Sequence, residues 1–191
     1  RGDGVYGEDV TMNVRTIESI PLKLEKPVNI TAEGEIWMGK KDFDKLNKAQ
    51  EKKGLPAFAN PRNVAAGTIR QLDPKIVSER KLQVFVYDLP KADFEIPDSQ
   101  LDELKKLGEL GFKVNKKFRF CKNIDEAIAF WREWGNKNES QDYWIDGIVL
   151  KVDSRKFQNI LGFTGKAPRW AIAFKFRAKQ ITTKLLDIKI Q

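Results

Sequence analysis

Residues 144–177 contain the two segments that decide the fold, WIDGIVLKV at 144–152 and GKAPRWAIAFKFR at 165–177. Both segments are rich in β-branched and aromatic residues, which favours β-strands. Each carries a lysine among apolar residues, Lys151 in the first and Lys175 in the second. We therefore predict two strands that direct both lysines into one shared site.

The second segment alternates between large apolar and smaller or basic residues. Trp170, Ile172, Phe174 and Phe176 are predicted to form a core face, whereas Lys175 lies on the opposite face with alanines and arginines. Small alanines leave room for a ligand, and a buried lysine needs a partner because an uncompensated charge there is costly. A nucleotide phosphate would be such a partner. An edge strand with a solvated basic face is the alternative.

The composition restricts the chemistry. The 191 residues include 35 basic and 27 acidic side chains, a net charge of +8 that is compatible with nucleic acid or nucleotide phosphates. There is no histidine, which excludes Ser-His-Asp catalysis and His-ligated metals. Cys121 is the only cysteine, so an internal disulfide is excluded. No apolar run is long enough to span a membrane, and we expect a cytoplasmic monomer that does not contact membranes.

The element order predicts an α+β fold with mainly antiparallel sheets. Strand patterns occupy 30–38 and 82–87, and helical patterns occupy 41–53, 99–110 and a segment that begins near 123. Short strands are expected at 112–114 and 118–120. Helices and strands do not alternate regularly, which argues against a doubly wound parallel sheet.

The segment FANPRNVAAGTIRQLDP at 58–74 brings Arg62 and Arg70 close together along short helical turns. A guanidinium group matches the oxygens of a phosphate, so these arginines could bind phosphates. A capped helix on the surface is the alternative, and the residues alone favour it.

Five motifs, taken together, resemble the adenylation (nucleotidyltransferase) domain of bacterial NAD-dependent DNA ligase. They are RGDGVYGEDVTMNVRTIESIPLKL, GEIWM, FANPRNVAAGTIRQLDP, DGIVLKV and KAPRWAIAFKF, in the order of that family. The resemblance implies an adenylation domain over 1–179 and the start of an OB-fold over 180–191, where KLLDIKIQ alternates as a strand does. The RGDG start without Met and this unpaired strand pattern indicate a fragment of a longer protein.

The resemblance implies a three-step reaction on NAD and nicked duplex DNA. A lysine attacks the α-phosphorus of NAD, nicotinamide mononucleotide leaves, and AMP stays on the enzyme. AMP then passes to the 5′-phosphate of a nick, and the 3′-hydroxyl displaces it to seal the strand, as needed in replication and repair. Each step is a displacement at phosphorus, which positioned lysines and a divalent metal, Mg²⁺ or Mn²⁺, would assist.

The same resemblance implies roles for particular residues. Lys151 and Lys175 match the two lysines that approach the α-phosphate, with Asp146 as a third catalytic residue. Arg1 and Glu35 match residues that contact the bound nucleotide. Asp146 and Glu35 are also expected to reach the metal, through water.

Arg62 and Arg70 match arginines expected to contact DNA or phosphate. Strict pleating puts Asp146 and Lys151 on opposite faces, so a shared site would require a bulge or twist, which Gly147 could permit.

One family motif is missing from this sequence, the Lys-x-Asp-Gly segment that holds the nucleophilic lysine. Arg1 stands in a similar RGDG pattern, but a guanidinium stays protonated and cannot attack. The nicotinamide-binding region and the zinc finger, the one part expected to hold zinc, are absent as well. We therefore expect that the 191 residues alone do not form a lysine–AMP adduct.

Two other functions compete with the ligase hypothesis. A non-catalytic basic module that binds DNA or a nucleotide would also explain the charge and the arginines. It would not need a carboxylate such as Glu35 among buried lysines. An ATP-dependent or RNA-joining relative would share the lysine motifs but would leave the 58–74 segment unexplained.

Overall fold

The computed structural model describes residues 6–165, 167–177, 182, 184, 186 and 187. Arg1 lies outside the described residues, and so does most of the 180–191 segment for which we predict an OB-fold strand. The helices and strands, in chain order, are α1 (Thr11–Val14), β1 (Ile30–Trp37), α2 (Lys40–Lys52), α3 (Pro61–Thr68), α4 (Pro74–Glu79), β2 (Gln83–Ala92), α5 (Gln100–Glu109), α6 (Ile124–Lys137), β3 (Gly147–Lys151), α7 (Arg155–Leu161), β4 (Phe163–Thr164), β5 (Ala167–Pro168) and β6 (Ala171–Lys175).

The described strands form three antiparallel pairs, β1–β2, β3–β6 and β4–β5. Together with the helices they confirm the predicted α+β class. The strands predicted at 112–114 and 118–120 are wrong, because that segment is irregular. It touches β2 through Lys113, whose carbonyl accepts from the Val86 amide (2.9 Å) and whose ammonium donates to the Gln83 side chain (2.8 Å).

Two apolar clusters hold the fold together. The first packs α2, α3 and α4 against the end of β1, with Met38, Phe43 and Val77 among its buried members. The second lies between β2 and α5 and includes Leu89 and Leu107, both fully buried. The burial of large apolar side chains at both places is the main stabilising contribution to the fold.

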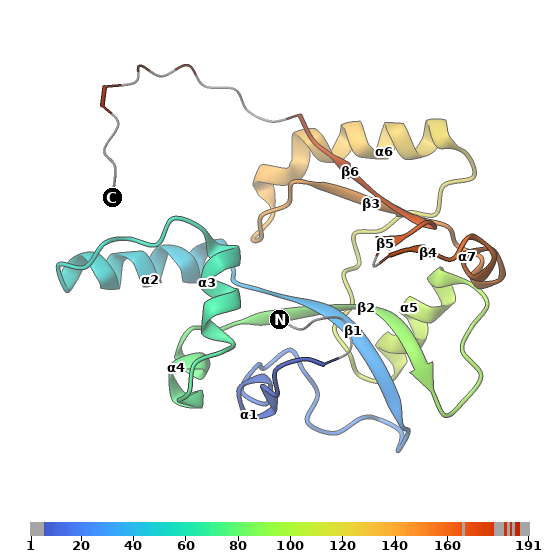
Figure 1. Cartoon of the computed structure of the whole chain (residues 1–191), viewed down its shortest axis with the longest axis horizontal. Coiled ribbons are helices and arrows are strands. Elements are labelled where there is room, and N and C mark those ends of the chain that lie inside the picture. Colours follow the sequence, from blue (N-terminus) through green and yellow to red (C-terminus); the bar gives the residue numbers. More distant parts are fainter. Residues whose placement is uncertain (1–5, 166, 178–181, 183, 185, 188–191) are drawn as a thin grey trace.

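The β3–β6 pair lies between α6 and the β1–β2 pair (Figure 1). Trp131 of α6 stacks on Phe174, with ring centroids 4.7 Å apart, so one face of β3–β6 is covered as predicted. The prediction fails for Ile172 on the same face, which is 65% exposed because the contacts of α6 are toward the other end of the strand.

The segment after β3 is attached to the start of α5. The Gln100 amide donates to the Asp153 carbonyl (2.8 Å), and the Ser99 hydroxyl donates to the Asp153 carboxylate (3.0 Å). Ser99 also caps α5 by accepting from the Asp102 amide. The two bonds to Asp153 join residues more than 50 positions apart and fix the end of β3, where Lys151 lies, beside the start of α5.

Candidate nucleotide-binding site

Lys151 is the last residue of β3, and its side chain is only 22% exposed. Its ammonium donates to the Tyr87 carbonyl (3.3 Å) and lies 4.0 Å from the Asp88 carboxylate. The rings of Tyr87 and Trp170 lie 5.0 and 5.6 Å from the same nitrogen, within cation–π range. The cation is therefore held in one place, with the partner that a buried charge requires.

Burial lowers the pKa of Lys151, and the carboxylates of Asp88, Glu103 and Glu33 oppose that shift. The ammonium is desolvated yet surrounded by negative groups. A cation in this environment interacts more strongly with an incoming phosphate than it would in water.

Lys175 lies on the same face of β3–β6 as Lys151. It stands opposite Gly147, and Gly147 and Lys151 are four positions apart on one strand. Side chains two or four positions apart share a face, so the two lysines share it at register positions about 13 Å apart. The Lys175 side chain is 70% exposed, and its ammonium lies 3.5 Å from the Asp146 carboxylate. Lys175 is thus on the predicted face but is not buried as predicted.

Gly147 lets β3 and β6 approach each other closely. A Cβ at this position would lie 2.4 Å from the Phe174 carbonyl oxygen and 2.6 Å from the Lys175 Cα. The register of β3–β6 is regular, so the bulge that we considered for Gly147 is absent from this pair. Asp146 nevertheless reaches the lysine face, because it precedes the strand and its carboxylate pairs with Lys175.

Glu35 lies on β1, where its carboxylate is 3.9 Å from the Arg62 guanidinium. Burial raises the pKa of the Tyr87 phenol, and Glu33, Glu35 and Asp88 raise it further. In the β1–β2 register Glu35 stands opposite Phe85, which shares a strand face with Tyr87 two positions further along β2. Lys151 contacts the Tyr87 ring, whereas Lys175 pairs with Asp146 at the other end of the β3–β6 pair.

Arg62 lies in the first turn of helix α3, and Arg70 follows the end of that helix. Its first turn is capped by Asn60, which accepts from the Arg62 and Asn63 amides, and Pro61 stands at the first helical position. The Arg62 side chain is 82% exposed, and Arg70 pairs with Glu8 at 3.6 Å. The helix is thus the capped surface helix that we considered as the alternative, and it leaves Arg62 open to a ligand.

Two cavities lie beside α3. One, of about 310 Å³, is lined by residues that include Phe58, Asn63 and Arg80; the other, of about 330 Å³, is lined by residues that include Glu8, Asn63 and Arg70. Lys151 and Lys175 line neither of these two cavities.

The described residues contain no preformed site for the expected Mg²⁺ or Mn²⁺ ion. Within the part of the chain that the structure describes, no three acidic or thiol groups gather closely enough to hold a metal ion. Asp146 and Glu35 are the two carboxylates expected to reach the metal. Asp146 pairs with Lys175 and Glu35 pairs with Arg62, so each carboxylate faces a different side-chain cation. The described residues do not fit a metal centre formed by protein ligands alone.

Sequence reasoning missed the three neighbours of Lys151, namely Tyr87, Asp88 and Trp170. The alternation predicts a core face for Trp170, whereas its ring centroid lies 5.6 Å from the Lys151 ammonium. Tyr87 and Asp88 follow an apolar run in β2. An aspartate inside a strand that packs on a helix is unusual, because aspartate is rarely buried without a partner, and this is the sequence feature that indicates a partner for Asp88.

The small antiparallel sheets and the half-buried lysine at the end of β3 agree with the nucleotidyltransferase fold that the sequence motifs imply. The chain belongs to the NAD-dependent DNA ligase adenylation domain family, whose model matches residues 1–179. It is 52% identical over 191 residues to a DNA ligase of Thermotoga neapolitana and 53% identical over 191 residues to one of Thermotoga maritima. It is 51% identical over 190 residues to a DNA ligase of Bacillus cereus.

Each of these matches covers 100% of this chain, and the chain spans 28% of the length of each relative. Among the described residues, no helix is long and apolar enough to cross a membrane.

Proposed function

We propose that this chain is the nucleotide-binding part of an NAD-dependent DNA ligase that seals nicks in duplex DNA. The observation that carries the proposal is Lys151, a half-buried cation fixed by Tyr87, Trp170 and Asp88 in a chain of the ligase adenylation family. NAD supplies the AMP that is transferred in the reaction. We further propose an adenylation domain over 1–179, the start of an OB-fold over 180–191, and action as a cytoplasmic monomer in replication and repair.

In this proposal Lys151 and Lys175 bind and orient the α-phosphate from one face of β3–β6. Placing two cations beside a phosphorus centre stabilises the charge that develops during displacement, which is the main demand of phosphoryl transfer. Asp146 holds Lys175 at one end of that face. Glu35 and Arg1 contact the nucleotide, and Arg62 and Arg70 bind DNA phosphates.

A divalent cation, Mg²⁺ or Mn²⁺, would neutralise phosphate charge during the reaction. Mg²⁺ keeps several waters and is commonly held by substrate phosphates together with one or two carboxylates. Asp146 and Glu35 would contact it through water in this proposal.

The test is nick sealing by the full-length ligase that carries this chain. We expect sealing of a nicked duplex with NAD and none with ATP, with an adenylated DNA intermediate visible on a denaturing gel. Binding of the nicked duplex without sealing under either nucleotide would favour the non-catalytic basic module instead. The Arg62→Ala variant should weaken DNA binding, because its exposed guanidinium is offered to phosphates.

A further inference from the structure

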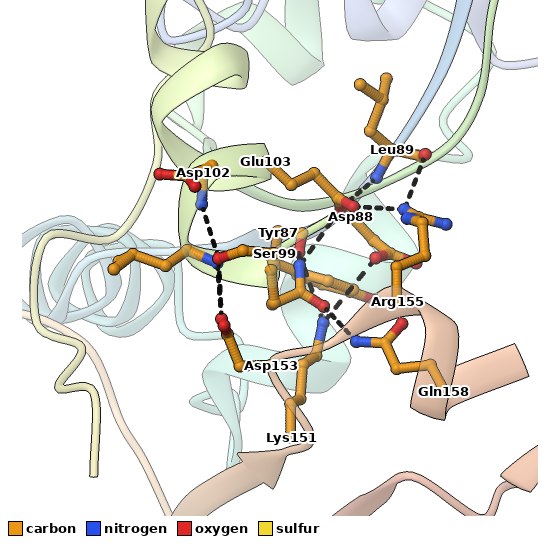
Figure 2. Close-up of polar contacts among 12 residues, drawn as sticks. Tyr87, Asp88, Leu89, Ser99, Asp102, Glu103, Lys151, Asp153, Arg155 and Gln158 are labelled. Atoms are coloured by element: carbon orange, nitrogen blue, oxygen red, sulfur yellow. Dashed lines mark hydrogen bonds and ion pairs between the residues drawn. The ribbon is translucent and has the colours of Figure 1, made fainter. Parts of the chain in front are cut away.

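Glu103 is a buried carboxylate to which the proposed reaction assigns no role. It lies on α5, is 1% exposed, and accepts from the Leu89 amide (2.7 Å) and the Gln100 side-chain amide (3.2 Å). It also forms an ion pair with Arg155 of α7, which donates in addition to the Leu89 carbonyl (3.2 Å). Figure 2 shows this network directly beside Lys151.

Asp88 connects this network to Lys151. Its side chain is 17% exposed and lies 4.0 Å from the Lys151 ammonium. Burial raises the pKa of Glu103; the Arg155 hydrogen bond opposes that shift, and the neighbouring Asp88 carboxyl adds to it. Asp88 is thus between a buried acid on α5 and the candidate phosphate-binding lysine on β3 (Figure 2).

The charged groups around Lys151 come from four elements. Glu33 of β1, Asp88 of β2 and Glu103 of α5 favour its charged form, and Arg155 of α7 disfavours it. Asp88 has the largest influence of the three carboxylates. The Tyr87 carbonyl accepts from the ammonium but carries no net charge. Asp88 is therefore the group whose removal should change the protonation of Lys151 most.

We propose that Asp88 is a positioning residue for Lys151. Asp88 keeps the Lys151 ammonium charged and directed along the face of β3–β6. The Glu103–Arg155 pair lies on the other side of Asp88 and holds it in place. The inference rests on the proposed function for its consequence in catalysis, but its physical content concerns the protonation of one lysine. An opposite charge within about 4–6 Å stabilises the charged form of a group, and burial destabilises it. Without Asp88, burial is opposed less, and Lys151 should lose its proton at lower pH.

The test is an NMR titration of the lysine ε-¹³C resonances in this 191-residue chain, with the Lys151 signal assigned by its loss in Lys151→Met. In Asp88→Asn the Lys151 titration should move to lower pH, and in Asp88→Glu it should return toward the wild-type curve. Asp102→Asn is the matched control, because it removes the same charge from an exposed side chain that pairs with Lys105. We expect no shift in that variant.

In the full-length ligase, Asp88→Asn should move the alkaline limb of the pH–rate profile to lower pH, as it moves the Lys151 titration. If Asp88→Asn does not fold, Asp88→Ser tests the same loss of charge. An unchanged Lys151 titration in a folded neutral variant would overturn the inference. The Lys151 titration could shift as expected while the full-length protein seals no nicks. That result would overturn the proposed function and leave the inference about Asp88 standing.

Discussion

Replacing Lys151 with methionine in the full-length ligase is expected to reduce nick sealing by about 10²–10³-fold or more, the usual loss when one preorganised charge donor is removed. The ammonium is the group that would contact the phosphate, and its position is fixed by Tyr87, Trp170 and Asp88. Methionine keeps an unbranched apolar stem at this position, so packing is largely retained. The loss should therefore appear in the rate of adenylate transfer of a variant that remains folded.

Lys156→Met provides the control for this experiment. Lys156 is exposed in the first turn of α7, five residues after Lys151, and its replacement removes the same charge. Sealing should stay within about twofold of the wild type, because an exposed charge contributes little to a screened site. If Lys151→Met sealed nicks within tenfold of the wild-type rate, the proposed role of Lys151 would be wrong.

Replacing Arg155 with methionine is expected to lower the free energy of unfolding by about 3–5 kcal/mol at neutral pH, because it removes one partner of a buried ion pair. Glu103 is 1% exposed and would remain without its guanidinium partner. Urea unfolding of the chain, followed by tryptophan fluorescence, measures this difference. The exposed Arg132→Met should change the same quantity by less than about 0.5 kcal/mol.

The loss in the free energy of unfolding caused by Arg155→Met should depend on pH. Burial raises the pKa of Glu103 in the folded state above its ordinary value of 4.5, and loss of the Arg155 bond removes a cause that lowers it. A carboxyl whose pKa is raised on folding contributes stability below its unfolded pKa and loses it as pH rises through the folded value. The variant should therefore be closest to wild type near pH 4 and furthest from it at pH 7–8.

The Glu103→Gln change in the Arg155→Met background gives a second check. Glutamine keeps an oxygen that can accept from the Leu89 amide and removes the buried charge. The double variant should recover most of the stability lost at pH 7–8. A single variant as stable as the wild type at pH 8 would show that the Glu103–Arg155 pair does not hold the structure in the way described.

The sequence predicted those features that depend on local pattern. The positions of β1, α2, α5 and α6 follow from apolar periodicity, and in the structure Ser99 and Asn123 cap the last two of these helices. The shared face of Lys151 and Lys175 was also predictable, since antiparallel pairing preserves alternation. Identification of the family rested on motifs spread over the chain.

What the sequence could not predict are contacts between distant segments. Asp88 and Lys151 are 63 positions apart, and Glu103 and Arg155 are separated by 52. No local pattern indicates that two such pairs meet. The exposure of Ile172 was missed for the same reason, because alternation reports a face but not how far a covering helix extends.

The central claim is that Lys151 and Lys175 bind one phosphate from the same face of β3–β6, and a crystal structure of this chain with AMP tests it most directly. The account predicts a phosphate oxygen within about 3 Å of the Lys151 ammonium, with the Lys175 ammonium turned toward the same group. A phosphate found instead in either cavity beside α3, with both ammonium groups still engaged as they are with Asp88 and Asp146, would contradict the account.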